Sequence, residues 1–236
     1  MARKPDERHQ QLKIAADLRS KIMSGELVPG EQLPSTAELA EMYASSKSTA
    51  NHATRLLQAE GFLYGRVGKG VFVRDRHPFV VRTGAYFDPA ARGVTYKILD
   101  VGEVDVSREV AAALEEERAV VRNRLMLRGE EPMELSWSYY PLSIVAGTAL
   151  TRKARISGGA PAVLADLGYS QRAFVDRLSI RPPTTEEAEL LELPGGVPVF
   201  RQFRVVYSDN ERPVEVSVLI KGGHLYELMY RQEIDD

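Results

Sequence analysis

The sequence predicts an α+β fold in two parts, a helical front third and a longer region dominated by strands. Apolar residues recur at helical spacing between residues 11 and 57, and two short apolar runs then flank a lysine that lies between glycines. From residue 120 onward, apolar and polar residues alternate in stretches that short turns separate. Strands joined by short turns pair in antiparallel fashion, so the second part is expected to be an antiparallel sheet with flanking helices.

Composition excludes several kinds of function. The chain has 236 residues, enough for two domains, and 44% of them are hydrophobic, enough for packed cores. It has no cysteine, which excludes disulfides, thiolate nucleophiles and iron–sulfur clusters and is typical of a cytoplasmic protein. The first residues are charged rather than apolar, and no apolar run is long enough to span a membrane. We therefore expect a cytoplasmic protein that makes no contact with a membrane.

An apolar stripe and a capping pattern indicate the first two helices. Apolar residues four apart predict an amphipathic helix over residues 11–24, with Gly25 after its end. Ser35 can cap a second helix, with Glu38 three residues later as the reciprocal partner of a capping box. The residues expected on the buried side of this second helix are Leu39, Met42 and Tyr43.

The third predicted helix has two unlike faces. Ser45 or Ser46 can cap its first turn, and Gly61 follows its end. Residues four apart lie on the same side of a helix, so a polar set and an apolar set separate into opposite faces. The outer face comprises Lys47, Ser48, Asn51, His52 and Arg55. The inner face comprises Ala50, Ala53, Leu56 and Leu57.

After the third helix, two apolar runs predict a tight hairpin with Lys69 at its exposed tip. Three short helices followed by a small hairpin form the winged helix-turn-helix plan, whose third helix enters the major groove of DNA. Hydroxyl groups allow close approach to phosphates, and Asn51 can form two hydrogen bonds with adenine. We therefore predict a DNA-binding domain over residues 1–76. The candidate DNA contacts are Ser35, Thr36, Ser46, Lys47, Ser48, Thr49, Asn51, His52, Arg55, Arg66 and Lys69.

A predicted linker over residues 77–94, with a short strand expected at 79–81, separates this domain from a second one over residues 95–236. Ser107 is expected to cap a short helix that ends at Ala113. Two further helices are expected at 161–167 and at 184–193, the latter with a capping box of Thr184 and Glu187. Strands are expected at 120–127, 133–140, 174–181, 197–207 and 213–220.

Charged residues on two of these strands suggest a ligand site. Arg122 and Arg124 lie on one face of the first strand, and Glu215 lies with Ser217 on one face of the last. If these two faces oppose each other across a cavity, they suit a small polar ligand that carries negative charge. The alternative is that these residues form surface ion pairs of little consequence.

Six segments of the front part form a specific set of motifs. They are Leu33-Pro34-Ser35, Glu38-Leu39-Ala40, Ser46 through Thr49, Leu57 through Gly61, Gly68-Lys69-Gly70 and Phe72-Val73. In these segments the chain resembles the DNA-binding domain of GntR-type bacterial transcription regulators, over roughly residues 10–75. Relatives often have Arg where this chain has Ala37, Lys47 and Asn51, and Arg prefers guanine whereas Asn prefers adenine. We therefore expect an operator that differs from the family's usual sequence where residues 37 and 51 read it.

Segments of the second part match a further domain pattern. They are Arg124 with Glu131-Pro132-Met133, Ser157-Gly158-Gly159, Arg181 to Glu187, Val197-Pro198-Val199, Arg212 to Glu215, and Tyr226. Residues 95–231 are similar to the UTRA effector domain of the HutC-type branch of the same family. The resemblance implies a chorismate-lyase-like fold that binds small metabolites, such as phosphorylated sugars, amino-acid derivatives or fatty acids. It also implies that ligand binding is relayed to the DNA-binding domains.

Two departures from the UTRA pattern bear on the effector. Met126 stands where many sugar-phosphate binders have a second Arg, and Gly223 with His224 occupies the place of a usual Asp-Arg pair. Both departures leave open a less charged or more apolar effector. The candidate effector-binding residues are Arg122, Arg124, Ser157, Gly159, Glu215 and Tyr226, of which Arg124, Ser157, Glu215 and Tyr226 match ligand-contacting positions in the related domains.

Two alternatives stay open. The fold implied for the second part also hosts a lyase, although no set of acid, base and nucleophile can be assembled from this chain. A DNA-binding protein whose sensor domain has lost its ligand is the other alternative. The four histidines lack metal-ligand spacing, so we expect no metal and no cofactor. We expect a ligand-controlled, non-enzymatic repressor that binds a near-palindromic double-stranded DNA operator as a homodimer.

Overall fold

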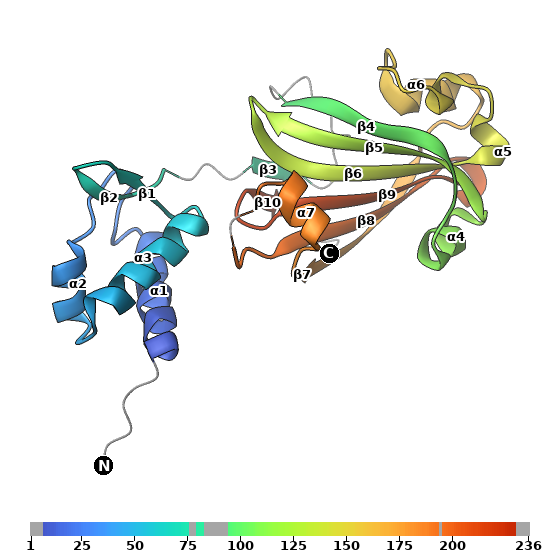
Figure 1. The fold of residues 1–236 in the computed structure, drawn as a ribbon. Helices are drawn as coiled ribbons and strands as arrows, with labels where there is room; N and C mark the ends of the chain where they lie inside the picture. The colour runs from blue at the N-terminus through green and yellow to red at the C-terminus, as the bar shows by residue number, and fades with distance from the viewer. Residues whose placement is uncertain (1–6, 76–78, 83–93, 194, 230–236) are drawn as a thin grey trace, which may run out of the picture. The chain divides into compact units, whose positions relative to one another are not determined.

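The computed structural model describes residues 7–75, 79–82, 94–193 and 195–229 (Figure 1). The chain divides into two compact units, a helical front unit and a larger unit built on a sheet. The α+β composition predicted from the sequence is confirmed. No helix in the described part is long and apolar enough to cross a membrane. The same residues hold no cluster of His, Cys, Asp or Glu suited to a metal ion.

The front unit consists of three helices and a two-stranded hairpin, as predicted. One buried cluster joins these elements. Ile14 of the first helix, Leu39 of the second, Ala53 and Leu57 of the third and Val73 of the hairpin are all buried in it. The elements are α1 (Glu7–Met23), α2 (Thr36–Met42), α3 (Lys47–Ala59), β1 (Leu63–Arg66) and β2 (Gly70–Val73).

Two details of the predicted front unit are wrong. The first helix begins at Glu7 rather than at residue 11, because helical backbone continues into a polar turn that carries no apolar stripe. Met42, which was expected to be buried, is 61% exposed. It is the last residue of the short α2, and its side chain lies on a groove at the surface of the unit, away from the core cluster.

The larger unit is built on a six-stranded sheet with strand order β4-β5-β6-β9-β8-β7, and every neighbouring pair is antiparallel, as predicted. β3 and β10 form a separate pair. The strands are β3 (Phe79–Arg82), β4 (Val94–Asp105), β5 (Arg118–Arg128), β6 (Glu131–Pro141), β7 (Ala173–Arg181), β8 (Val199–Tyr207), β9 (Pro213–Gly222) and β10 (Tyr226–Met229). The helices are α4 (Arg108–Leu114), α5 (Leu142–Val145), η2 (Ala149–Thr151), α6 (Gly159–Asp166), α7 (Thr185–Leu190) and η3 (Asp209–Glu211).

The two faces of the six-stranded sheet differ in the side chains that they carry. One face is apolar and is covered by α4 and α7. Val110 of α4 packs there with Phe203, and Leu191 at the end of α7 packs with Leu135. On the opposite face, α5, η2 and α6 cover one end through a cluster that includes Val120. The rest of that second face carries buried polar side chains, and it is called the polar face below.

Several elements of the larger unit differ from the prediction. Strands β4 and β10 and the short helices α5 and η2 are missed. The helix that was expected to reach Leu193 ends at Leu190, because Glu192 adopts a left-handed backbone with φ 48°. The short strand expected at 79–81 is confirmed as β3, whereas linker residues 76–78 and 83–93 lie outside the described residues.

The predicted helix caps are confirmed in both units. The Ser35 hydroxyl oxygen accepts a hydrogen bond from the Glu38 amide at 3.3 Å, and the Ser35 amide donates to the Glu38 carboxylate at 2.7 Å. The same reciprocal pair forms between Thr184 and Glu187 at the start of α7. Ser107 caps α4 as expected. Short-range capping signals therefore locate the starts of these three helices without help from tertiary contacts.

Candidate functional site

The outer face of α3 is exposed, as the sequence predicts. Lys47, Ser48, Asn51, His52 and Arg55 are all exposed. Residues of the inner face hold the helix against α1 and α2, because three of them are fully buried in the front-unit core. Those three residues are Ala50, Ala53 and Leu57. A rigid helix thus presents two basic side chains, an amide, a hydroxyl and an imidazole to the outside.

Thr49 is the exception among the candidate DNA contacts of α3. It is only 4% exposed, and its hydroxyl lies 2.8 Å from the hydroxyl of Ser46. The Ser46 hydroxyl also accepts from the Thr49 amide at 3.1 Å. The structure therefore assigns Thr49 to the capping of α3, and it does not lie on the exposed face. Ser46 itself stays exposed at the first turn.

The hairpin presents Arg66 and Lys69, both exposed. The Arg66 guanidinium lies over the rings of Tyr64 and Phe72, at 5.3 and 5.1 Å from their centres, which limits its motion. The Lys69 carbonyl accepts a hydrogen bond of 2.8 Å from the Gln32 side chain, so the tip is tied to the segment before α2. These contacts place both cations on an ordered hairpin rather than on a loose loop.

Positive charge on α3 and the hairpin is not neutralised by acids of the front unit. Arg19 of α1 forms an ion pair with Glu60 at 2.6 Å, and Lys21 lies 3.5 Å from Asp17. No such pair occurs, within the described residues, at four cations: Lys47, Arg55, Arg66 and Lys69. Unpaired surface cations are available to phosphates, whose contacts supply most of the sequence-independent affinity for DNA.

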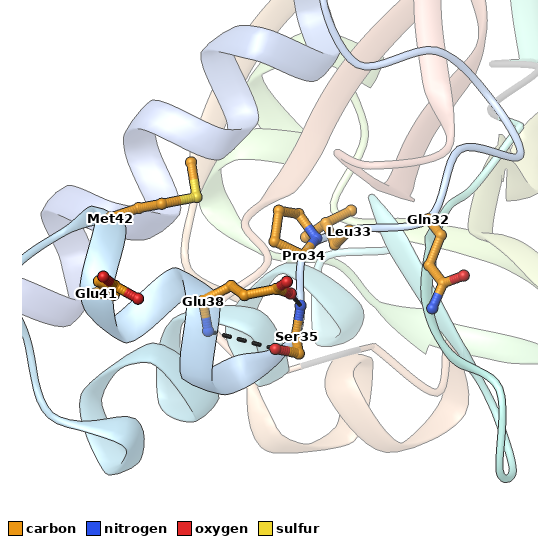
Figure 2. A pocket seen from close by; sticks show the side chains of 7 residues that line it. All are labelled: Gln32, Leu33, Pro34, Ser35, Glu38, Glu41 and Met42. Atoms are coloured by element: carbon orange, nitrogen blue, oxygen red, sulfur yellow. Dashed lines mark hydrogen bonds between the residues drawn. The ribbon is translucent and has the colours of Figure 1, made fainter.

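The start of α2 offers a narrower polar surface (Figure 2). Ser35 and Thr36 are exposed there, and the Ser35 hydroxyl hydrogen is free to donate to a phosphate while its oxygen caps the helix. A groove runs beside α2, and Glu38 and Glu41 face it. Phosphates avoid such carboxylates, so on α2 only Ser35 and Thr36 at its very start suit contact with DNA.

In the larger unit, Arg122 serves the fold. Its side chain is buried, and its guanidinium donates to the carbonyls of Leu150, Arg152 and Ala154 at 2.9, 2.7 and 2.8 Å. Burial lowers the pKa of this guanidinium below its ordinary value. Three backbone acceptors occupy the group that was predicted to hold a ligand. Arg122 therefore anchors the segment after α5 to the sheet.

A hydrogen-bonded row on the polar face joins other predicted effector residues. Arg124 donates to the Ser138 hydroxyl at 2.7 Å, Ser138 lies 2.7 Å from the Ser217 hydroxyl, and Ser217 donates to Glu215 at 2.6 Å. Gln171 donates to the same Glu215 carboxylate at 3.2 Å. The Arg124 Nε is buried and has no hydrogen-bond partner within the described residues. One donor of the row therefore remains available.

The expected opposition of two charged strands across a cavity is wrong. The strands that carry Arg124 and Glu215, β5 and β9, lie in one sheet with only β6 between them. Ser138 of β6 is paired with Arg122 on one side and with Ser217 on the other. The charged residues therefore lie side by side on one face. They are neighbours because β5, β6 and β9 are adjacent in the sheet. The alternation of polar and apolar residues along each strand does not predict this order of strands.

Sequence reasoning missed a second polar row on the same face. Lys221 lies 2.9 Å from both Glu134 and the Gln202 side chain, and Gln202 donates to Asp176 at 2.9 Å. Arg204 forms a two-bond pair with Asp176 at 2.8 and 2.7 Å. Glu134 and Arg204 each lie between two apolar residues of their strands, and that alternation is the signal that could have found them. Asp176 and Gln202 each have an arginine as a neighbour, so alternation does not mark them.

The remaining effector candidates lie apart from the Arg124 row. Burial raises the pKa of the Tyr226 hydroxyl well above its usual value, and Glu134 raises it further. Lys221 lies 5.5 Å from the centre of the Tyr226 ring, so Tyr226 adjoins the second polar row. Ser157 is exposed, and Gly159 begins α6 with φ 69°. No hydrogen bond among the described residues joins Ser157 or Gly159 to Arg124.

Comparison with known proteins agrees with this arrangement. Residues 10–73 match the family model "Bacterial regulatory proteins, gntR family", and residues 90–227 match the UTRA domain model. An uncharacterised HTH-type transcriptional regulator of Streptomyces coelicolor is 29% identical, over 94% of this chain and 92% of that protein. The transcriptional repressor NagR of Bacillus subtilis is 26% identical, with 92% of each chain covered. A crystal structure assigned to the GntR family of regulators is 26% identical and has a TM-score of 0.65, covering 96% of this chain and 98% of that one.

Proposed function

Since this chain belongs to the gntR family of bacterial regulatory proteins and carries a UTRA domain, it is a transcription regulator, and we propose that it is a repressor released from DNA by a small effector. Its relatives include the repressor NagR of Bacillus subtilis, which supports repression as the mode of action. The DNA-binding domain of the proposal spans residues 1–76 and the effector domain residues 95–236, joined by 77–94. We place the chain in the HutC-type branch of the family.

One observation carries the DNA-binding half of the proposal. α3 is rigidly packed on its apolar side and exposes basic and amide groups on the other, without acids to neutralise them. Such a face suits the major groove, where phosphate contacts position the helix and base contacts specify the sequence. We assign base contact to Asn51 and phosphate contact to Lys47 and Arg55. Arg66 and Lys69 on the hairpin reach the neighbouring backbone.

We propose that the regulator works as a homodimer. Two copies of α3 related by a two-fold axis read two half-sites of opposite orientation, so the operator is a near-palindrome. Because Asn51 stands where relatives often carry Arg, each half-site favours adenine at the base that residue 51 reads. A protein that binds the chromosome works in the cytoplasm of a bacterium, and we propose that location.

The effector site of the proposal is the polar face around Arg124. An arginine with a buried, unpartnered Nε beside two serine hydroxyls suits a ligand with one acidic or carbonyl oxygen. The other cations of that face are already paired, Lys221 with Glu134 and Arg204 with Asp176. This supports an effector with little negative charge over a doubly charged phosphosugar. We propose binding and release, without chemical turnover.

A gel-shift titration with the DNA just upstream of the regulator's own gene tests the proposal. Wild type is compared with Lys47→Ala and Asn51→Ala at fixed salt. Each substitution removes one contact per subunit and is expected to weaken binding by about ten- to a hundredfold. Lys47→Ala is also expected to flatten the dependence of affinity on salt, since fewer counterions are released.

Lys13→Ala is the matched control, because Lys13 is an exposed lysine of α1 and is not among the candidate DNA contacts. It removes the same charge and is expected to leave binding nearly unchanged. If Lys13→Ala weakens binding as strongly as Lys47→Ala, the affinity comes from overall charge and not from α3. If neither α3 variant differs from wild type on a DNA fragment that wild type binds, the assignment of the interface is refuted.

A further inference from the structure

Strand β7 presents an open sheet edge with apolar side chains. It pairs with β8 along all nine of its residues without a register shift, and it has a neighbour on one side only among the described strands. Val175, Leu178 and Ile180 are 55%, 47% and 70% exposed. Monomeric proteins protect long regular edges with charges, bulges or covering segments, so an edge of this kind is a surface for strand pairing.

The opposite edge of the same sheet is protected. Strand β4 contains an irregularity between Ile98 and Asp100, which interrupts its pairing surface. The carbonyl of Tyr96 accepts from Arg155 at 3.1 Å, and the carbonyl of Leu99 accepts from Lys153 at 2.5 Å. Two of its carbonyls are therefore occupied by side chains of the same chain. No side chain of the described residues does this for β7.

Arg177 and Asp176 of β7 do not block pairing at its edge, because each forms an ion pair over a face of its own sheet. Arg177 pairs with Glu109 at 3.0 Å and lies 4.4 Å from the centre of the Phe203 ring. Asp176, on the other face, is held by Arg204 at 2.7 Å. What remains at the edge is a run of backbone donors and acceptors lined by aliphatic groups.

We propose that β7 is the dimer interface of this regulator, and that it pairs antiparallel with β7 of a second copy about a two-fold axis at Leu178. Two six-stranded sheets then form one continuous sheet. This inference rests on the homodimer of the proposed function and specifies where the two copies meet. A two-fold interface buries the same surface patch of both copies. The exposed edge of β7 therefore has to be complementary to a second copy of itself.

The side chains of β7 select this register. A two-fold axis perpendicular to the sheet keeps each residue on its own face, so the axis passes through a residue. An axis at Asp176 or at Arg177 places that charge opposite its copy, and an axis at Ser179 places Arg177 opposite Arg181. Like charges directly opposite each other are destabilising. Of these four central positions, only Leu178 avoids such a pair.

The Leu178 register also brings together two of the three exposed aliphatic residues, Leu178 and Ile180. Leu178 faces its own copy, and Ile180 of each copy lies diagonal to it on the same face, within reach of an aliphatic side chain. Arg177 faces Ser179, a neutral partner. The pair at the axis is apolar and central, where interface residues contribute most to affinity.

Disulfide cross-linking of the full-length protein tests the register, because the chain contains no cysteine of its own. In Leu178→Cys, the two thiols of a dimer lie directly opposite, with Cα atoms about 4.5–5.5 Å apart, which a disulfide spans. Mild oxidation is expected to link most chains into covalent dimers. Val175→Cys is the matched control, since position 175 faces residue 181 of the other copy and lies far from its own copy.

Sedimentation of charge variants completes the test. Leu178→Lys and Leu178→Glu are each expected to be monomeric, and an equal mixture of the two is expected to recover the dimer. A wild-type dimer in which Leu178→Cys fails to cross-link and Leu178→Lys stays dimeric places the interface elsewhere and overturns the inference. A wild type that is monomeric, and stays so with operator DNA, overturns the homodimer of the proposed function itself.

Discussion

Arg122 shows how a single buried cation can hold a segment that has little regular structure. Its guanidinium donates to three carbonyls between residues 150 and 154, a stretch that passes from η2 into irregular backbone. The buried guanidinium needs acceptors, and a charged donor can hold several carbonyls at once. The alternation of residues correctly predicts that Arg122 and Arg124 share a face. It cannot tell which of the two meets the backbone.

Replacement of Arg122 is therefore expected to destabilise the protein. Arg122→Met keeps the length of the side chain but leaves three acceptors without a donor, and we expect a loss of about 3 kcal/mol in the free energy of unfolding. Urea denaturation followed by circular dichroism measures it. Arg118→Met, on the same strand, removes a 58% exposed arginine that pairs with Glu103 and is expected to cost less than about 1 kcal/mol. Equal losses in the two variants contradict the anchoring role.

Asn51 carries a prediction about base preference. Arg bonds guanine in two places and Asn bonds adenine in two places, so Asn51→Arg is expected to shift one base of each half-site from adenine to guanine. Selection of bound fragments from a randomised library, for both proteins in parallel, measures the change. His52→Ala is a suitable comparison, because it alters the same exposed face without adding a guanidinium. An unchanged preference at every position in Asn51→Arg places residue 51 outside the base-reading set.

At the scale of elements, the starts of helices that carry a side-chain cap are predictable from the sequence, whereas uncapped helix starts and some strands are not. The capping boxes at Ser35 and Thr184 depend on residues three apart, so the sequence contains the whole signal. β4 is missed because its irregularity after Ile98 and the glycine at 102 interrupt the period of two. Met42 is misplaced because the end of a short helix depends on what packs beyond it.

The α7 capping box predicts a pH dependence. Burial tends to raise the pKa of Glu187, but hydrogen bonds from Arg181 and from the Thr184 amide outweigh it and lower that pKa below its usual value. A lowered pKa in the folded state stabilises the protein above the pKa of the unfolded chain, near 4.3, and this stabilisation is lost as pH falls through the folded value.

Glu187→Gln is accordingly expected to destabilise the protein by about 2 kcal/mol at pH 7 and to differ little from wild type below the folded pKa. Denaturation in urea at a series of pH values between about 3 and 7 covers this window. Glu186→Gln alters the exposed neighbour in the same turn and is expected to be nearly neutral throughout. A constant difference between Glu187→Gln and wild type across the whole series contradicts the assignment to ionisation of Glu187.

At the scale of the whole molecule, the sequence reveals two functional units but not the strand order of the second. The strands of the polar face come from distant parts of the chain, and Ser138 and Ser217 meet because β6 and β9 are neighbours in the sheet. Periodicity assigns each residue to a face, and only the order of strands says which faces coincide. The predicted opposition of charged strands fails for this reason, although the residues themselves converge.

Effector control requires that ligand binding in the effector domain lowers the affinity of the DNA-binding domain for the operator. An effector that releases the repressor lowers its affinity for the operator by about 5- to 150-fold, and by linkage the operator lowers affinity for the effector by the same factor. A thermal-shift screen of uncharged and singly charged metabolites identifies the ligand, since saturation stabilises the folded protein. Titration of that ligand with and without operator then measures both factors.

Arg124→Met separates sensing from DNA binding. The substitution removes the buried Nε and the bond to Ser138 while leaving the front unit untouched, so operator binding is expected to persist and the ligand-induced shift to vanish. Arg128→Met, on the same strand, removes an arginine already paired with Glu131 and is expected to keep both responses. A ligand response retained in Arg124→Met moves the effector site away from the Arg124 row. The α6 start at Gly159 then becomes the place to test, because it lies on the same unit and makes no hydrogen bond with that row in the described structure.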